Sequence, residues 1–172
     1  VWRISRARLP WLLIGMVGGV FGAQVISGFE GGIEKVPELA FYIPLIMAMG
    51  GNIGVQSSAI VVQSLAKDSN PLGSIFKKIA RESIVALING AFLSILIFAI
   101  AFAFGNSTLG FVVSISLFAV ILVAAIFGTL IPLLLNKYEI DPALATGPFI
   151  TTLNDVVGPF IYFTIGMMMY NL

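Results

Sequence analysis

The segment Asp141-Pro-Ala-Leu-Ala-Thr-Gly-Pro-Phe-Ile-Thr-Thr-Leu-Asn-Asp155 opens the last apolar stretch of the chain and carries most of the information about its fold. Asp141 followed by Pro142 predicts a helix N-terminus, because aspartate is a favoured N-cap and proline suits the first helical position. From Pro142 to Tyr170 the only charged residue is Asp155, 13 residues after Pro142. At about 1.5 Å of rise per residue, Asp155 would lie roughly 20 Å along the helix, within a hydrocarbon layer about 30 Å thick. The segment therefore predicts a membrane-spanning helix with an acid deep in the membrane.

An acid at that depth needs a partner. It costs roughly 2.5–3.5 kcal/mol on membrane-insertion scales unless it is paired or faces a water-filled cavity. The chain has no His, and no Lys or Arg lies at a comparable depth, so the simplest partner is a cation that comes and goes. One carboxylate is a poor divalent site, whereas two, supplied by a two-fold symmetric homodimer, would match a 2+ ion. Because magnesium dehydrates reluctantly, we expect Asp155 and Asn52 to hold a largely hydrated ion.

The composition indicates an integral membrane protein. Of 172 residues, 59% are hydrophobic and 10% are charged, which is more apolar surface than a soluble domain of this size could bury. A net charge of +1 predicts no nucleic-acid partner. The absence of Cys and His removes the usual ligands of zinc, copper, haem and iron–sulfur centres, so any metal would be a hard cation bound by oxygen. No P-loop pattern is present, and we expect no enzymatic activity.

Five apolar stretches predict an all-α, polytopic fold with five transmembrane helices in a single domain, residues 1–172. The expected spans are about 9–29, 37–66, 83–104, 110–135 and 142–170. Gly15, Gly18, Gly19 and Gly22 in the first span form two overlapping pairs that favour close helix packing. Residues 67–82 read as a polar loop, in which Arg81 and Glu82 are expected to form a solvated interfacial pair.

The second span contains Gly50-Gly-Asn-Ile-Gly-Val-Gln56. Its three glycines are expected to weaken the helix and to free backbone carbonyls toward protein or a wet cavity. Asn52, Gln56, Ala59 and Gln63 recur at helical spacing and form a largely polar stripe. Hydrogen bonding between helices would explain such a stripe about equally well, but glycines beside the amides favour the lining of a pore.

On the fifth span, one helical face is expected to be polar; its members are Pro148, Thr151, Thr152, Asp155, Pro159 and Tyr162. A helical proline removes the hydrogen bond to the carbonyl four residues back, so Pro159 would free the Asp155 carbonyl as a further oxygen ligand. A simple kink is the slightly favoured alternative. The predicted metal site comprises Asp155, Asn52, Gly51, Gln56, Thr151 and Thr152.

The distribution of basic residues predicts the orientation. Eight of the nine Lys and Arg residues lie on one side of the predicted membrane, and only Lys35 lies on the other; the eight are Arg3, Arg6, Arg8, Lys67, Lys77, Lys78, Arg81 and Lys137. By the positive-inside rule, a multi-pass protein of the plasma membrane with five spans would have a cytoplasmic N-terminus and an external C-terminus.

Three segments together resemble the membrane domain of the MgtE magnesium channel/transporter family. They are Arg8-Leu-Pro-Trp-Leu-Leu13, Pro44-Leu-Ile-Met-Ala-Met-Gly-Gly-Asn-Ile-Gly-Val-Gln56 and 141–155, quoted above. The resemblance implies a homodimer with a magnesium pore between protomers, lined by the second and fifth spans, and a pore acid at Asp155. This sequence contains neither the N-terminal nor the CBS domains that commonly precede this region in the family, so gating by those domains is not carried over. Animal solute-carrier relatives of MgtE, which also lack them, are an equally good comparison.

We therefore expect a dimeric channel or transporter that conducts hydrated Mg²⁺ across the lipid bilayer, with Mn²⁺ and Co²⁺ as alternative cargo ions. A proton- or sodium-coupled divalent cation exchanger, in which Asp155 alternates between protonated and metal-bound forms, is the second hypothesis. A non-transporting scaffold subunit with a protonated Asp155 is the third. A pH gradient that drives uptake without voltage would favour the second, and magnesium-dependent thermal protection would argue against the third.

Overall fold

The computed structural model describes residues 1–67, 75–104 and 106–172. Within these ranges all regular elements are helices: α1 (Trp2–Ser27), α2 (Glu30–Lys35), the 3-10 helix η1 (Pro37–Tyr42), α3 (Ile43–Lys67), α4 (Ile75–Ala103), α5 (Ser107–Lys137) and α6 (Pro142–Tyr170). Four stretches of the described chain are long and apolar enough to cross a membrane, namely Ser5–Ser27, Pro37–Ala66, Lys77–Ala103 and Ser107–Lys137. The predicted all-α class is confirmed.

The helix starts follow from local sequence. The Asp141 side chain accepts a hydrogen bond from the backbone N–H of Ala143 at 2.9 Å, which confirms the predicted cap of α6. Asn106 caps α5 in the same way and accepts from the N–H of Leu109 at 3.0 Å. Each cap satisfies a donor that the first helical turn would otherwise leave unpaired.

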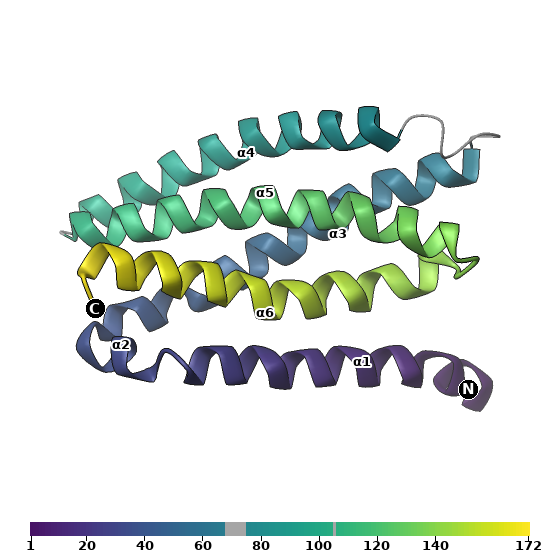
Figure 1. Ribbon diagram of the computed structural model, residues 1–172, viewed down its shortest axis with the longest axis horizontal. Helices are drawn as coiled ribbons and strands as arrows, with labels where there is room; N and C mark the ends of the chain where they lie inside the picture. Colours follow the sequence, from purple (N-terminus) through teal and green to yellow (C-terminus); the bar gives the residue numbers. More distant parts are fainter. Residues whose placement is uncertain (68–74, 105) are drawn as a thin grey trace.

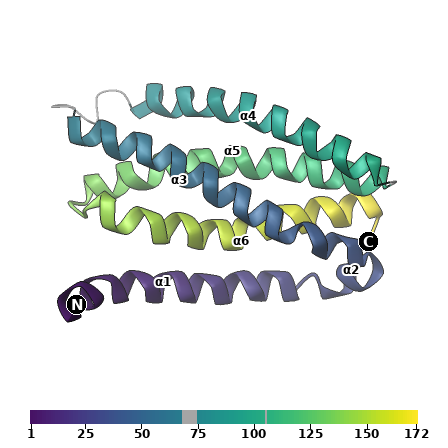
Figure 2. The ribbon, with the colours of Figure 1, turned by 180° about the vertical axis from the view of Figure 1, so that it is seen from behind.

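The long helices form a flat bundle (Figures 1 and 2). α6 packs between α1 and α5, α4 packs on the far side of α5, and α3 crosses both α5 and α6 obliquely. The N-terminus, the end of α3, the start of α4 and the α5–α6 connection lie at one end of the bundle, and α2 and the C-terminus lie at the other. The helix ends that carry most of the basic residues therefore share the N-terminal end of the bundle.

The glycines of α3 do not interrupt the helix, so the predicted weak point is wrong. α3 is continuous from Ile43 to Lys67. A Cβ on Gly50 would lie 2.6 Å from the Asn154 side-chain oxygen, and one on Gly54 would lie 2.6 Å from Ile150 Cγ2. The glycines instead let α3 cross α6 at close range, which a side chain at either position would prevent.

The polar loop expected at residues 67–82 is shorter than predicted. Residues 68–74 lie outside the described part of the chain, and α4 already begins at Ile75. Glu82 is thus in a helix and is only 7% exposed, so the expected solvated pair with Arg81 is wrong. Successive helical residues point about 100° apart, which leaves Arg81 exposed while Glu82 turns toward the bundle interior.

The core is centred on α5 and the second half of α6. Val112, Val113 and Ile121 of α5 are fully buried and cluster with Leu39 of η1 and Phe163 of α6. Tyr162 is also fully buried, and its hydroxyl donates a hydrogen bond to the Leu39 carbonyl at 2.8 Å. This bond ties the short η1 helix to α6.

Replacing Tyr162 by phenylalanine is expected to lower the free energy of unfolding by about 1 kcal/mol, because the Leu39 carbonyl loses this buried donor. Reversible unfolding of the purified chain in mixed micelles measures the change. Tyr138→Phe is the matched control, because Tyr138 is 69% exposed. Equal effects of the two substitutions would contradict a structural role for the hydrogen bond.

Candidate cation site

A groove of about 570 Å³ lies between α3 and α6. Five of the six predicted site residues line it: Gly51, Asn52 and Gln56 from α3, and Thr151 and Asp155 from α6. Met47, Ala48, Val55 and Asn154 complete the lining. The predicted convergence of the second and fifth spans is therefore present in a single chain, although the two segments lie about a hundred residues apart in the sequence.

The oxygen-bearing side chains of the groove suit a hard cation. Asn52, Gln56 and Thr151 are exposed, so their carbonyl and hydroxyl oxygens are accessible, and Asp155 is half-buried beside them. Ala59 and Gln63 are exposed as well, which confirms that the predicted polar stripe follows one open face of α3. Among the described lining residues Asp155 is the only ionisable group. Oxygen ligands around one carboxylate favour magnesium-like ions over softer metals.

The two adjacent threonines of α6 have different environments. Thr151 lines the groove, and its hydroxyl donates to the carbonyls of Gly147 at 3.2 Å and Pro148 at 3.1 Å. Thr152 faces α1 instead, where it contacts Gly18 and donates to the Ile14 carbonyl at 3.4 Å. Thr152 is therefore a packing residue of the α1–α6 contact rather than a member of the groove lining.

The α1–α6 contact also determines where the Asp155 carbonyl points. The carbonyl lies against Gly22, which, like Gly18, has no side chain to block the approach of α6. The expectation that this carbonyl adds an oxygen to the site is not met, because the carbonyl faces α1. Pro159 and Tyr162 are fully buried, so they do not share the open face of Thr151 either. The close helix packing expected of the first span is confirmed for Gly18 and Gly22, both of which contact α6.

Asn154 is a lining residue that the sequence reasoning missed. Its side chain is only 8% exposed and packs on Gly50, and its Nδ2 has no hydrogen-bond partner. A buried amide nitrogen without an acceptor costs about 1–3 kcal/mol unless water or a ligand's oxygen atom satisfies it. Its position directly before Asp155 was the available clue. A water in the shell of a bound ion could accept from this amide.

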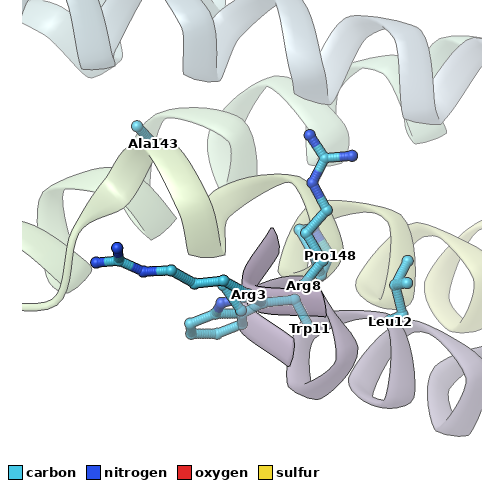
Figure 3. A pocket seen from close by; sticks show the side chains of 7 residues that line it. Arg3, Arg8, Trp11, Leu12, Ala143 and Pro148 are labelled. Carbon is cyan, nitrogen blue, oxygen red and sulfur yellow. The ribbon is translucent and has the colours of Figure 1, made fainter. Parts of the chain in front are cut away.

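A second hollow, of about 520 Å³, lies between α1 and the start of α6 (Figure 3). Arg3, Arg8 and Trp11 contribute its largest side chains, and the two guanidinium groups point in different directions. Its described lining contains no carboxylate, amide or hydroxyl side chain. A cation would find only positive charge and apolar surface there, so this hollow is not a candidate cation site.

Residues 43–165 match the sequence model of the MgtE family, which is described as a divalent cation transporter. This range includes every described residue that lines the groove. The chain belongs to the MgtE family of divalent cation transporters. The predicted family resemblance is thereby confirmed.

Curated relatives are the magnesium transporters MgtE of three bacteria. The chain is 42% identical to that of Bacillus subtilis over 159 residues, covering 92% of this chain and 35% of the relative. It is 38% identical to that of Enterococcus faecalis over 167 residues, covering 96% of this chain and 37% of the relative. It is 34% identical to that of Thermus thermophilus over 163 residues, covering 95% of this chain and 36% of the relative. The chain thus spans little more than a third of the length of these MgtE relatives.

Proposed function

We propose that this chain transports magnesium by conducting the hydrated ion past Asp155. The observation that carries the proposal is the groove that places Asp155 with Asn52, Gln56 and Thr151 on an open face of the bundle. At roughly 10–15 Å³ per water, six waters need about 60–90 Å³, so a groove of about 570 Å³ has room for a hydrated ion. The magnesium transporters named above support the choice of ion.

The proposal includes five membrane spans, with α6 as the fifth. α6 has 29 residues, enough to cross a hydrocarbon layer about 30 Å thick, and it packs along α1 and α5. With the N-terminus cytoplasmic, the basic end of the bundle would face the cytoplasm, as the positive-inside rule requires. Asp155 is near the middle of α6, so it would then lie near the membrane centre.

The proposal also includes a homodimer with the groove at its interface. Asn52, Gln56 and Gln63 are exposed on the single chain, and amides on a lipid-facing surface would lose their hydrogen bonds. A second copy facing this surface would enclose a wet path in place of lipid. It would also bring a second Asp155, so that two carboxylates match the charge of one divalent ion.

Passive conduction would suffice for uptake. Moving a 2+ ion through about 100 mV, inside negative, releases about 4.6 kcal/mol, which corresponds to roughly a thousandfold accumulation.

Magnesium uptake into liposomes that contain the purified chain tests the function directly. Flux no greater than that of protein-free liposomes would overturn the proposal.

Because the chain has no cysteine, a single introduced cysteine reports on the dimer interface. Gln63 lies on the polar stripe of α3. We expect a short bis-maleimide to cross-link most of the Gln63→Cys variant into dimers in liposomes. Ile95→Cys on α4 is the control, because Ile95 is 70% exposed but lies away from the groove. Denaturing gel electrophoresis gives the readout. Cross-linking through α4 but not through α3 would place the interface elsewhere.

A further inference from the structure

Glu82 lines a small separate hollow between α3 and α4. The hollow has a volume of about 50 Å³, and its polar lining comprises Glu82 and Asn89 from α4 and Gln56 and Ser57 from α3. Glu82 and Asn89 are seven residues apart, which is two helical turns, so both face α3. The function proposed above makes no use of Glu82 or Asn89.

The Glu82 side chain is largely buried, and no residue in the described part of the chain pairs with its carboxylate. Its side chain is 7% exposed, and it makes no hydrogen bond or ion pair in the part of the chain that the structure describes. Ser57, which is 5% exposed, also has a hydroxyl without a hydrogen-bond partner among the described residues. A buried carboxylate is costly unless a counter-charge and hydrogen bonds compensate it. The other described residues that line the hollow are apolar and supply neither a counter-charge nor a side-chain hydrogen bond.

The chemistry of the hollow suits a cation. One carboxylate, two amides and one hydroxyl provide four oxygen-bearing side chains from two helices, which is the ligand type of hard cations. At roughly 10–15 Å³ per water, a hollow of about 50 Å³ holds an ion with a few waters at most. The ion would therefore be partly dehydrated here, unlike a hydrated ion in the much larger α3–α6 groove.

Gln56 connects the two places, because it lines both the groove and this hollow. We propose that Glu82, Asn89, Gln56 and Ser57 form a second divalent-cation site, separate from Asp155, in the wall between α3 and α4. Occupation of this site supplies the positive charge that Glu82 lacks. Through Gln56, an ion bound there also orients an amide of the groove lining. The inference goes beyond the proposed transport function and stands on the α3–α4 hollow alone.

Counting bound metal in variants that lack the groove carboxylate tests this inference. Mn²⁺ is the probe, and its binding to the purified full chain in a neutral detergent is measured by electron paramagnetic resonance. Asp155→Asn is expected to retain one saturable Mn²⁺ site per chain. Adding Glu82→Gln should remove it, whereas adding Glu34→Gln, a change at an exposed residue of α2, should leave it intact. No saturable site in Asp155→Asn, or an unchanged site after Glu82→Gln, overturns the inference.

A second variant and a stability measurement distinguish loss of the metal site from loss of the folded structure. Asn89→Ala in the Asp155→Asn background removes another ligand and should weaken Mn²⁺ binding several-fold; unchanged affinity would count against the site. In metal-free buffer, Glu82→Gln should unfold at the same temperature as its parent or higher, because it removes an uncompensated charge. The result is independent of magnesium flux through the groove, so the two proposals can fail separately.

Discussion

Replacing Asp155 by asparagine is expected to reduce magnesium flux by roughly a hundredfold or more. Asparagine keeps the shape of the side chain but removes the only ionisable group that lines the groove in the described part of the chain. A hydrogen bond to a charged group is worth about 1.5–3 kcal/mol, so two protomers together lose about 3–6 kcal/mol, or roughly 10²–10⁴-fold in ion affinity. Magnesium uptake into liposomes with a fluorescent indicator measures the change.

Asp141→Asn is the matched control for this substitution. Asp141 is exposed and caps α6 through Ala143, and asparagine is an equally good N-cap, so flux should be unchanged. Magnesium should also raise the unfolding temperature of the unmodified chain more than that of Asp155→Asn, because a ligand that binds only the folded state stabilises it. A folded Asp155→Asn protein with full flux would refute the role proposed for the carboxylate.

Replacing Gly128 by alanine is expected to lower the free energy of unfolding by about 1–3 kcal/mol. Gly128 on α5 faces Gly54 on α3, and an added Cβ would clash with the Gly54 backbone carbonyl and lie 3.0 Å from Ser57 Cβ. A backbone carbonyl within a helix cannot move aside as a flexible side chain can, so the two helices must separate. Because α3 also carries Asn52 and Gln56, flux should fall as well.

Gly19→Ala makes the same chemical change without the clash. No heavy atom lies within 4 Å of the position that a Cβ on Gly19 would occupy, so alanine should be neutral or stabilising by about 0.5–1 kcal/mol. Unfolding in mixed micelles compares the two variants under identical conditions. Similar stabilities for Gly128→Ala and Gly19→Ala would show that the α3–α5 crossing is looser than the structure indicates.

Two residues illustrate what could not be predicted from local sequence. Thr151 and Thr152 are identical in type and adjacent, yet one lines the groove and the other bonds to α1. The choice depends on the rotation of α6 about its axis, which is set by Gly18 and Gly22 on a helix far away in the sequence. The burial of Glu82 could not be predicted for a related reason. The charged residues around it indicate a polar loop, whereas α4 begins at Ile75 and includes them in a helix.

The sequence by itself determined that the chain is a helical membrane protein and that Asp141 caps its last helix. It also predicted an acid, Asp155, deep in the membrane with amide side chains nearby. These follow from apolar length, cap chemistry and the cost of a charge in hydrocarbon, all of which are local properties. Only the tertiary structure decided that α3 stays continuous, that Thr152 leaves the groove, and that Asn154 and Glu82 are buried. Those outcomes depend on how closely helices approach at Gly18, Gly50 and Gly128, which only packing among distant segments determines.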